Sequence, residues 1–192
     1  MCVMPALDWN LTLRDQWEFH WENQLRTRLA GLTDAEYSWS PTPDAWSVRP
    51  RGTSPAPVHA GAGDFTIDFA FPQPVPPPFT TISWRLGHVI VGVLAMRNAA
   101  HFDAPPASYE TWDYAGTAAG ALEQLETQLE RWTEGVRGLD DTALTTPVGE
   151  KEPAFPERPM ADLVLHIQRE LIHHLSEVCL LRDLHHHTGA HR

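Results

Sequence analysis

The sequence is short of lysine, of cysteine and of long apolar runs. Among its 192 residues are 14 lysines and arginines, of which only Lys151 is a lysine, against 25 aspartates and glutamates. The net charge of −11 argues against a nucleic-acid partner held by phosphate contacts, and equally against an anionic membrane surface. No apolar run approaches the roughly 18 residues that a membrane span requires.

The two cysteines, Cys2 and Cys179, are too few for a disulfide framework. The first residues, MCVMPALDWN, lack both the basic and the apolar region of a secretory signal peptide. The length suits one domain, and the 42% apolar content suffices for a sizeable core. We therefore expect a single-domain cytoplasmic protein in a reducing environment.

Apolar residues at spacings of three and four predict a mostly helical chain. Four long helices are predicted, at about residues 11–31, 81–100, 116–138 and 161–183. Asn10 is a plausible N-cap for the first helix, and Thr80 or Thr81 for the second. The predicted fold class is all-α: a four-helix bundle domain over residues 1–184, followed by a flexible histidine-rich tail, 185–192.

The connection between the first two helices, residues 33–79, is long and rich in proline. Its tryptophans, Trp39 and Trp46, are expected to anchor it to the bundle. Alternating apolar residues between Phe65 and Phe71 indicate a short extended ribbon within it. Such a connection forms either a crossover along the bundle or a lid over a site.

The last helix carries ionisable side chains where a core-facing stripe is expected. At about 100° per residue, His174 lies within the apolar stripe and Glu170 lies at its edge. The apolar members of the stripe are Leu163, Ile167, Leu171, Val178 and Leu181. Arg169, His173 and Glu177 are predicted to lie further round, towards solvent. A glutamate and a histidine at positions i and i+4 on one helix face can hold a metal ion between them.

His88, in the middle of the apolar second helix, is the candidate third ligand. Small residues on the same side, Gly92 and Ala95, leave space beside its ring. Two histidines and one glutamate form the ligand set of a catalytic divalent metal site, suited to Zn²⁺, Fe²⁺, Ni²⁺ or Mn²⁺. The HExxH signature of zinc proteases is absent, so peptidase chemistry has no support.

Each ligand assignment has a plainer alternative. A single histidine on an apolar helix, such as His88, is often a hydrogen-bonded core residue. Glu170 has a common alternative in an ion pair with Arg85 or Arg97. His166 and His173 also stand four residues from a glutamate, so spacing alone leaves them as competitors for a metal.

Two stretches, TISWRLGHVIVGVLAMRNAAHF and LVLHIQRELIHHLSEVCLLRDLH, resemble the DinB/YfiT-like metalloenzyme superfamily in its actinobacterial branch. The similarity extends through the first helix and the loop WSVRP at 46–50. The resemblance implies a four-helix bundle of DinB/YfiT-like topology, whose metal is bound by a histidine on the second helix and an [HE]-x-x-x-H pair on the fourth. His88, Glu170 and His174 match those positions. Many members have histidine in place of Glu170; the glutamate form resembles the mycothiol-dependent maleylpyruvate isomerases.

What this resemblance implies is thiol chemistry: a divalent-metal-dependent thiol transferase or isomerase that activates a mycothiol-like thiol towards a small electrophile. Zinc is the first choice of metal, with nickel, iron or manganese as alternatives, and mycothiol is the expected co-substrate. Arg85 and Arg97 are candidates to hold an acidic substrate or a thiol carboxylate, although either could simply form an ion pair. Trp84, with Gly92 and Ala95, is expected to line the cavity at the metal.

Two other functions use the same features. A non-catalytic DinB-like protein could bind a small molecule or a metal in a stress response, and a metal-dependent hydrolase could use the same three ligands. In each case we expect a small-molecule ligand and no nucleic-acid or membrane partner. The chain is expected to be a monomer or a homodimer.

Overall fold

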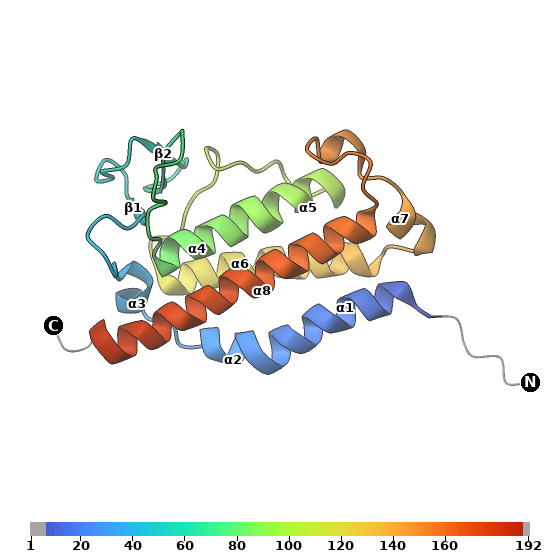
Figure 1. Ribbon diagram of the computed structural model, residues 1–192, viewed down its shortest axis with the longest axis horizontal. Coiled ribbons are helices and arrows are strands. Elements are labelled where there is room, and N and C mark those ends of the chain that lie inside the picture. The colour runs from blue at the N-terminus through green and yellow to red at the C-terminus, as the bar shows by residue number, and fades with distance from the viewer. Residues whose placement is uncertain (1–6, 190–192) are drawn as a thin grey trace, which may run out of the picture.

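The computed structural model describes residues 7–189, in which four long helical segments lie side by side (Figure 1). Two of them contain a π-helical stretch, and α8 continues into a π-helical turn. The segments are α1 (Trp9–His20) with Trp21–Leu25 and α2 (Arg26–Leu29); α4 (Ile82–His88) with Val89–Ala95 and α5 (Met96–His101); α6 (Ala118–Arg137); and α8 (Met160–Leu184) with His185–Gly189. Contacts of α8 with α4 and α1, and of α6 with α4, α5 and α1, enclose the core.

The mostly helical character of the chain is confirmed, and the observed helices lie within two residues of the predicted bounds. Thr81 caps α4 as predicted, because its side chain accepts a hydrogen bond from the Trp84 N–H. The first cap was wrong: α1 begins two residues earlier than predicted, and its N-cap is Asp8. Asn10 instead donates from its amide to the carbonyls of Val136 and Leu139, at 2.7 and 2.8 Å, and ties α1 to the end of α6.

The all-α assignment is wrong in the long connection, which forms a three-stranded antiparallel sheet. Its strands are β1 (Val48–Pro50), β2 (Val58–Ala60) and β3 (Phe65–Phe69), in the order β1-β3-β2. The extended ribbon predicted from the apolar alternation is the central strand, β3, and its Ile67 is fully buried. Phe71 lies outside the strand and is almost fully exposed. A short helix, α3 (Asp34–Ser38), precedes the sheet.

The sheet packs against α4, the first part of the second helical segment. The Trp84 indole of α4 donates to the carbonyl of Asp68 at 2.8 Å. Trp46 packs against both Phe69 and Trp84, with its ring centroid 6.0 and 6.1 Å from theirs. The buried Asp68 carboxylate accepts from the Ser47 N–H at 2.9 Å and from Arg49 at 3.0 Å. The connection is therefore held against the first turn of α4, one turn before His88.

In the second half of the chain, α8 packs against the first and second helical segments. A short helix, α7 (Asp141–Thr145), and a 3₁₀ turn, Gly149–Lys151, lie in the connection between α6 and α8. All five predicted stripe residues of α8 are buried. Within residues 7–189, none of the helices combines the length and the apolar character needed to cross a membrane.

Two further predictions concerned the cysteines and the C-terminal tail. Cys2 lies outside the described residues, and Cys179 is a free, buried thiol on α8. The predicted tail begins with the π-helical turn His185–Gly189, and its last residues, 190–192, also lie outside the described part. The flexibility of this tail stays a prediction.

Candidate metal centre

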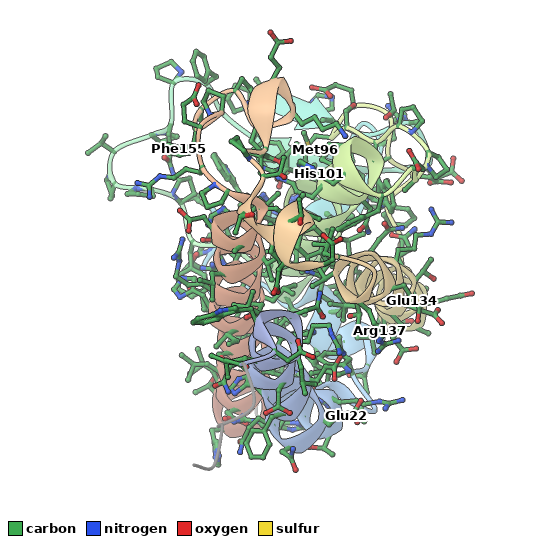
Figure 2. All side chains as sticks on the ribbon, turned by 90° about the vertical axis from the view of Figure 1, so that its right-hand side faces the viewer. Glu22, Met96, His101, Glu134, Arg137 and Phe155 are labelled. Carbon is green, nitrogen blue, oxygen red and sulfur yellow. The ribbon has the colours of Figure 1, made fainter. Side chains whose placement is uncertain are left out.

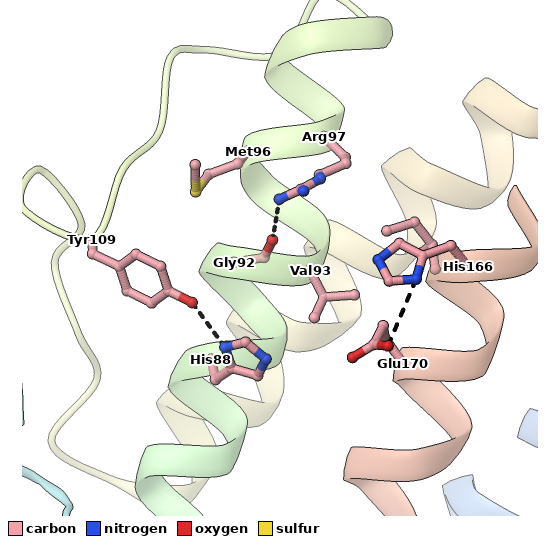
Figure 3. A pocket seen from close by; sticks show the side chains of 9 residues that line it. His88, Gly92, Val93, Met96, Arg97, Tyr109, His166 and Glu170 are labelled. Atoms are coloured by element: carbon pink, nitrogen blue, oxygen red, sulfur yellow. Dashed lines mark hydrogen bonds and ion pairs between the residues drawn. The ribbon is translucent and has the colours of Figure 1, made fainter. Parts of the chain in front are cut away.

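His88 is the last residue of α4, where the helix widens into its π-helical stretch. Such widening within a helix is frequent at functional sites. The imidazole stacks on the Trp84 indole at 5.5 Å and 14°. Its Nδ1 lies 2.8 Å from the Tyr109 hydroxyl (Figure 3). Burial and, to a smaller extent, the neighbouring cationic groups lower the pKa of His88 to about 4. The ring is therefore neutral at physiological pH, as a metal ligand must be.

Tyr109 was not predicted from the sequence and comes from the irregular connection between α5 and α6. Gly92, one turn beyond His88, makes room for it: a Cβ at Gly92 would overlap the Tyr109 hydroxyl. The Tyr109 phenol thus takes up part of the space predicted beside the His88 ring, and it lines the cavity that remains. Burial raises the pKa of Tyr109 to about 12, so the hydroxyl keeps its proton.

Helix α8 supplies the other two candidate ligands. Oε2 of Glu170 lies 3.4 Å from Nε2 of His174. The rings of His88 and His174 meet edge to face, with centroids 4.8 Å apart at 89°. One potential ligand atom from each of His88, Glu170 and His174 lies within 4.8 Å of the other two. The structure therefore brings together the three residues selected from the sequence.

The expectation that Glu177 faces solvent is wrong, because its side chain turns towards His174 and Arg85. Its Oε2 lies 2.8 Å from Nδ1 of His174 and is bound by the Arg85 guanidinium. If Nδ1–H of His174 donates to this carboxylate, Nε2 is left as the ligand atom on the Glu170 side. Tyr109 has the same relation to Nδ1 of His88. Hydrogen bonds of this kind, from the far side of a metal-binding imidazole, orient the ring and select its tautomer.

Glu170 does not form the predicted alternative ion pair with arginine in the described part of the chain. Arg85 is engaged by Glu177, and Arg97 donates to the Gly92 carbonyl at 2.6 Å and to Glu152 at 3.2 Å. Apart from His174, the histidine next to Glu170 is His166, whose Nδ1 is 3.6 Å from Oε1.

A cavity of about 260 Å³ lies beside His88 and Glu170 (Figure 3). Its lining also includes Gly92, as predicted, and Arg97 and His166. Trp84 and Ala95 do not line it: Trp84 stacks on the ring of His88, and Ala95 is buried in the core. Arg85 lies beside His174 instead: it donates to Glu177, the closer partner of Nδ1, and its Nη1 is 3.3 Å from Nδ1. The substrate-binding roles assigned to Arg85, Arg97 and Trp84 stay predictions.

The residues at this site fit a divalent transition metal. Two neutral imidazoles and one carboxylate are the ligand set of open catalytic zinc and iron sites, and the adjoining cavity offers access for a further ligand. A second grouping on α8 joins His174 to His173 and Glu177. It is less suitable, because Glu177 is already paired with Arg85 and the His173 side chain is 64% exposed.

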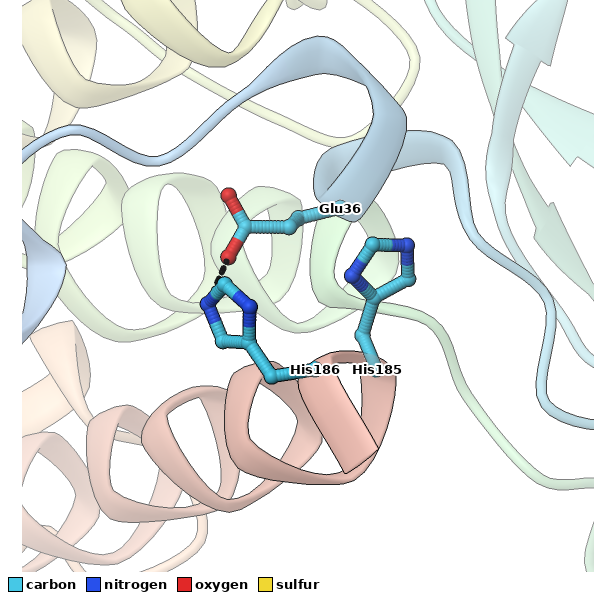
Figure 4. A group of neighbouring side chains, drawn as sticks. All are labelled: Glu36, His185 and His186. Carbon is cyan, nitrogen blue, oxygen red and sulfur yellow. Dashed lines mark ion pairs between the residues drawn. The ribbon is translucent and has the colours of Figure 1, made fainter. Parts of the chain in front are cut away.

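A third grouping, far from this site, joins Glu36 of α3 to His185 and His186 (Figure 4). The Glu36 carboxylate already accepts hydrogen bonds at both oxygens. Oε1 accepts from Arg182 at 2.8 Å, and Oε2 accepts from the backbone N–H of Thr33 at 2.7 Å and from its hydroxyl at 2.8 Å. A cation at Glu36 would have to displace these donors and stand beside the Arg182 guanidinium, so we assign this grouping a structural role.

We expect Tyr109→Phe to weaken metal binding about 10- to 100-fold, the usual cost of losing a hydrogen bond that orients a metal-binding histidine. The measurement is competition for Zn²⁺ with a fluorescent chelator. The matched control is Tyr37→Phe, which removes a hydrogen bond from a buried hydroxyl to the Ala115 carbonyl at 2.8 Å, away from the site. Equal Zn²⁺ affinity in wild type and Tyr109→Phe would contradict the orienting role of the phenol.

Comparison with known proteins places the chain in a family. The sequence model described as the DinB superfamily matches residues 16–178. Searches of curated proteins and of solved structures found no match. The matched range contains all three candidate ligands, Tyr109 and Glu177.

Proposed function

The chain belongs to the DinB superfamily, and from this membership and the candidate site we propose that it is a divalent-metal-dependent thiol transferase or isomerase. Its co-substrate would be a low-molecular-weight thiol of the mycothiol type, and its substrate a small electrophile. The observation that carries the proposal is the convergence of His88, Glu170 and His174 beside a cavity of about 260 Å³.

The side chains around the ligands support this chemistry. A divalent ion held here supplies Lewis acidity, which lowers the pKa of a coordinated thiol and keeps its sulfur nucleophilic near neutral pH. Tyr109 and Glu177 hold the two imidazoles in orientation through their Nδ1 atoms. The Cys179 thiol is the only one among residues 7–189, and it is buried, so within this part of the chain no cysteine offers an accessible sulfur and the nucleophile would be an external thiol.

Further assignments belong to the same proposal. Zinc is the first choice of metal, with nickel, iron and manganese as alternatives for the same ligands. Arg97, which lines the cavity, would contact an acidic group, and Arg85 and Trp84 would support His174 and His88. We expect a four-helix bundle of the superfamily's topology, in a monomer or homodimer located in the cytoplasm. Its actinobacterial character also stays a prediction.

The test combines metal analysis with a thiol assay. Protein reconstituted with each metal is mixed with mycothiol and chlorodinitrobenzene, and thioether formation is followed by absorbance. We expect product formation to need both thiol and metal, and to be lost in Glu170→Gln. The control is Glu123→Gln, which changes an exposed glutamate of α6 in the same way.

Two outcomes would replace this function by another. Ester hydrolysis by metal-loaded protein in the absence of thiol would assign the site to a hydrolase. Tight binding of a small molecule by metal-free protein, with no turnover of any thiol, would favour the binding module.

A further inference from the structure

A second and larger cavity, of about 560 Å³, adjoins the metal cavity. It lies between α8 and the connection that precedes it. Arg97 and His166 line both cavities, and therefore stand at their junction. A molecule bound in this outer cavity could extend past them towards His88 and Glu170.

The outer cavity carries more positive than negative side chains, although the whole chain has a net charge of −11. Its lining includes three arginines and two carboxylates. Arg97 is paired with Glu152 at 3.2 Å and Arg158 with Asp162 at 3.1 Å. This leaves Arg169, which has no carboxylate partner among residues 7–189 and is exposed. The surplus positive charge is therefore at Arg169, and it favours an anion.

Arg169 also contacts the His166 ring at the junction. Its Nη2 lies 2.8 Å from Nδ1 of His166, and a guanidinium can only donate, so Nδ1 is the acceptor. In the neutral ring the proton is then on Nε2. The junction of the cavities thus carries the His166 ring beside Arg97, whose Nε is buried without a hydrogen-bond partner in the described part of the chain.

The rim of the outer cavity is apolar. Phe155 lies on the connection between α7 and α8, near the start of α8 (Figure 2), and is 69% exposed. Leu165 of α8 is 48% exposed. Val148, Ala154 and Leu163 add apolar lining. Large exposed apolar side chains around a cavity favour a ligand with an apolar body.

We propose that the outer cavity binds an organic acid with an apolar body, its carboxylate at Arg169 and its body against Phe155 and Leu165. This inference rests on the proposed function, because it makes the outer cavity the recognition site for a molecule whose reactive end enters the metal cavity. The carboxylate can come from the electrophile or from the thiol.

Calorimetry with two pairs of probes tests the proposal: cinnamate with cinnamamide, and N-acetylcysteine with N-acetylcysteinamide. Within a pair the acid carries a carboxylate and the amide a neutral group at the same position, and the rest of the molecule is identical. We expect the acid to bind about tenfold more tightly than the amide, and Arg169→Gln to abolish that preference. Arg131→Gln, which changes an exposed arginine of α6, should leave it intact. A preference in the cinnamate pair identifies the electrophile as the source, and one in the cysteine pair identifies the thiol.

The absence of a preference in both pairs, or its survival in Arg169→Gln, would overturn the inference. The same titrations on His174→Ala separate it from the proposed function. Retention of the preference in that variant supports the outer cavity, even if the wild-type protein binds no metal and the proposed function fails. Loss of the preference there would mean that the acid binds the metal instead, which overturns the outer site and leaves the metal site standing.

Discussion

His88→Ala protein should come from purification without bound metal, whereas His173→Ala protein should keep about one ion per chain. The two variants distinguish the two groupings that share His174. His88 belongs to the grouping beside the cavity, and His173 belongs to the exposed grouping with Glu177. Losing a ligand should cost more than the roughly 10- to 100-fold that losing an outer hydrogen bond costs. Elemental analysis after dialysis against a weak chelator measures the metal content.

A second substitution at the same position distinguishes loss of the ligand atom from unfolding of His88→Ala. His88→Asn keeps a polar atom near the position of Nδ1, where it can still meet the Tyr109 hydroxyl, but it lacks a counterpart of Nε2. We expect His88→Asn to unfold near the wild-type temperature in the absence of metal and to remain free of metal. Metal loss from His173→Ala, with retention in both His88 variants, would move the site to His173, His174 and Glu177.

The candidate ligands on α8 could be proposed from the sequence because their pairing depends on the helical period and on the apolar stripe, and the family resemblance selected the same pair. Glu170 and His174 are one turn apart, so any helix through them brings their side chains to one face. The helical wheel directed Glu177 towards solvent, whereas its carboxylate meets His174 and Arg85. Arg85 reaches Glu177 from α4, and no feature within one helix predicts which charged residue a neighbouring helix will present.

Tyr109 and the sheet could not be predicted, for a different reason. Tyr109 lies in an irregular connection, where no period relates sequence position to direction. The sheet had a signal only in its central strand. Its partners, Val48–Pro50 and Val58–Ala60, are three residues long, too short to show an alternating pattern, and one of them ends in proline. The glycine at 92 was a usable clue: it marked the space beside His88, although not the residue that fills it.

Glu36→Gln should cost the fold about 3 kcal/mol at neutral pH, although Glu36 is far from the candidate metal centre. The Glu36 carboxylate joins α3 to the end of α8 and is 2% exposed. Burial raises the pKa of Glu36, but hydrogen bonds from Arg182 and Thr33 outweigh it and lower the pKa from its ordinary 4.5 to about 2. Glutamine of the same size turns one acceptor into a donor, which would face donors already present. Arg182 also donates to the Ala30 carbonyl at 3.1 Å, so its disturbance would loosen the turn that follows α2.

The pH dependence separates this charge effect from a general packing defect. Because the folded-state pKa of Glu36 lies below its unfolded value, its contribution to stability is complete above about pH 4.5 and is lost as the pH falls towards 2. Urea unfolding at several pH values should therefore show the wild type and Glu36→Gln converging over that window. Glu134→Gln is the control, since Glu134 forms an exposed pair with Arg137 and should change stability by less than about 0.5 kcal/mol. A difference between wild type and Glu36→Gln that stays constant from neutral pH to pH 3 would show that the loss comes from packing, and that the Glu36–Arg182 pair does not carry the stability.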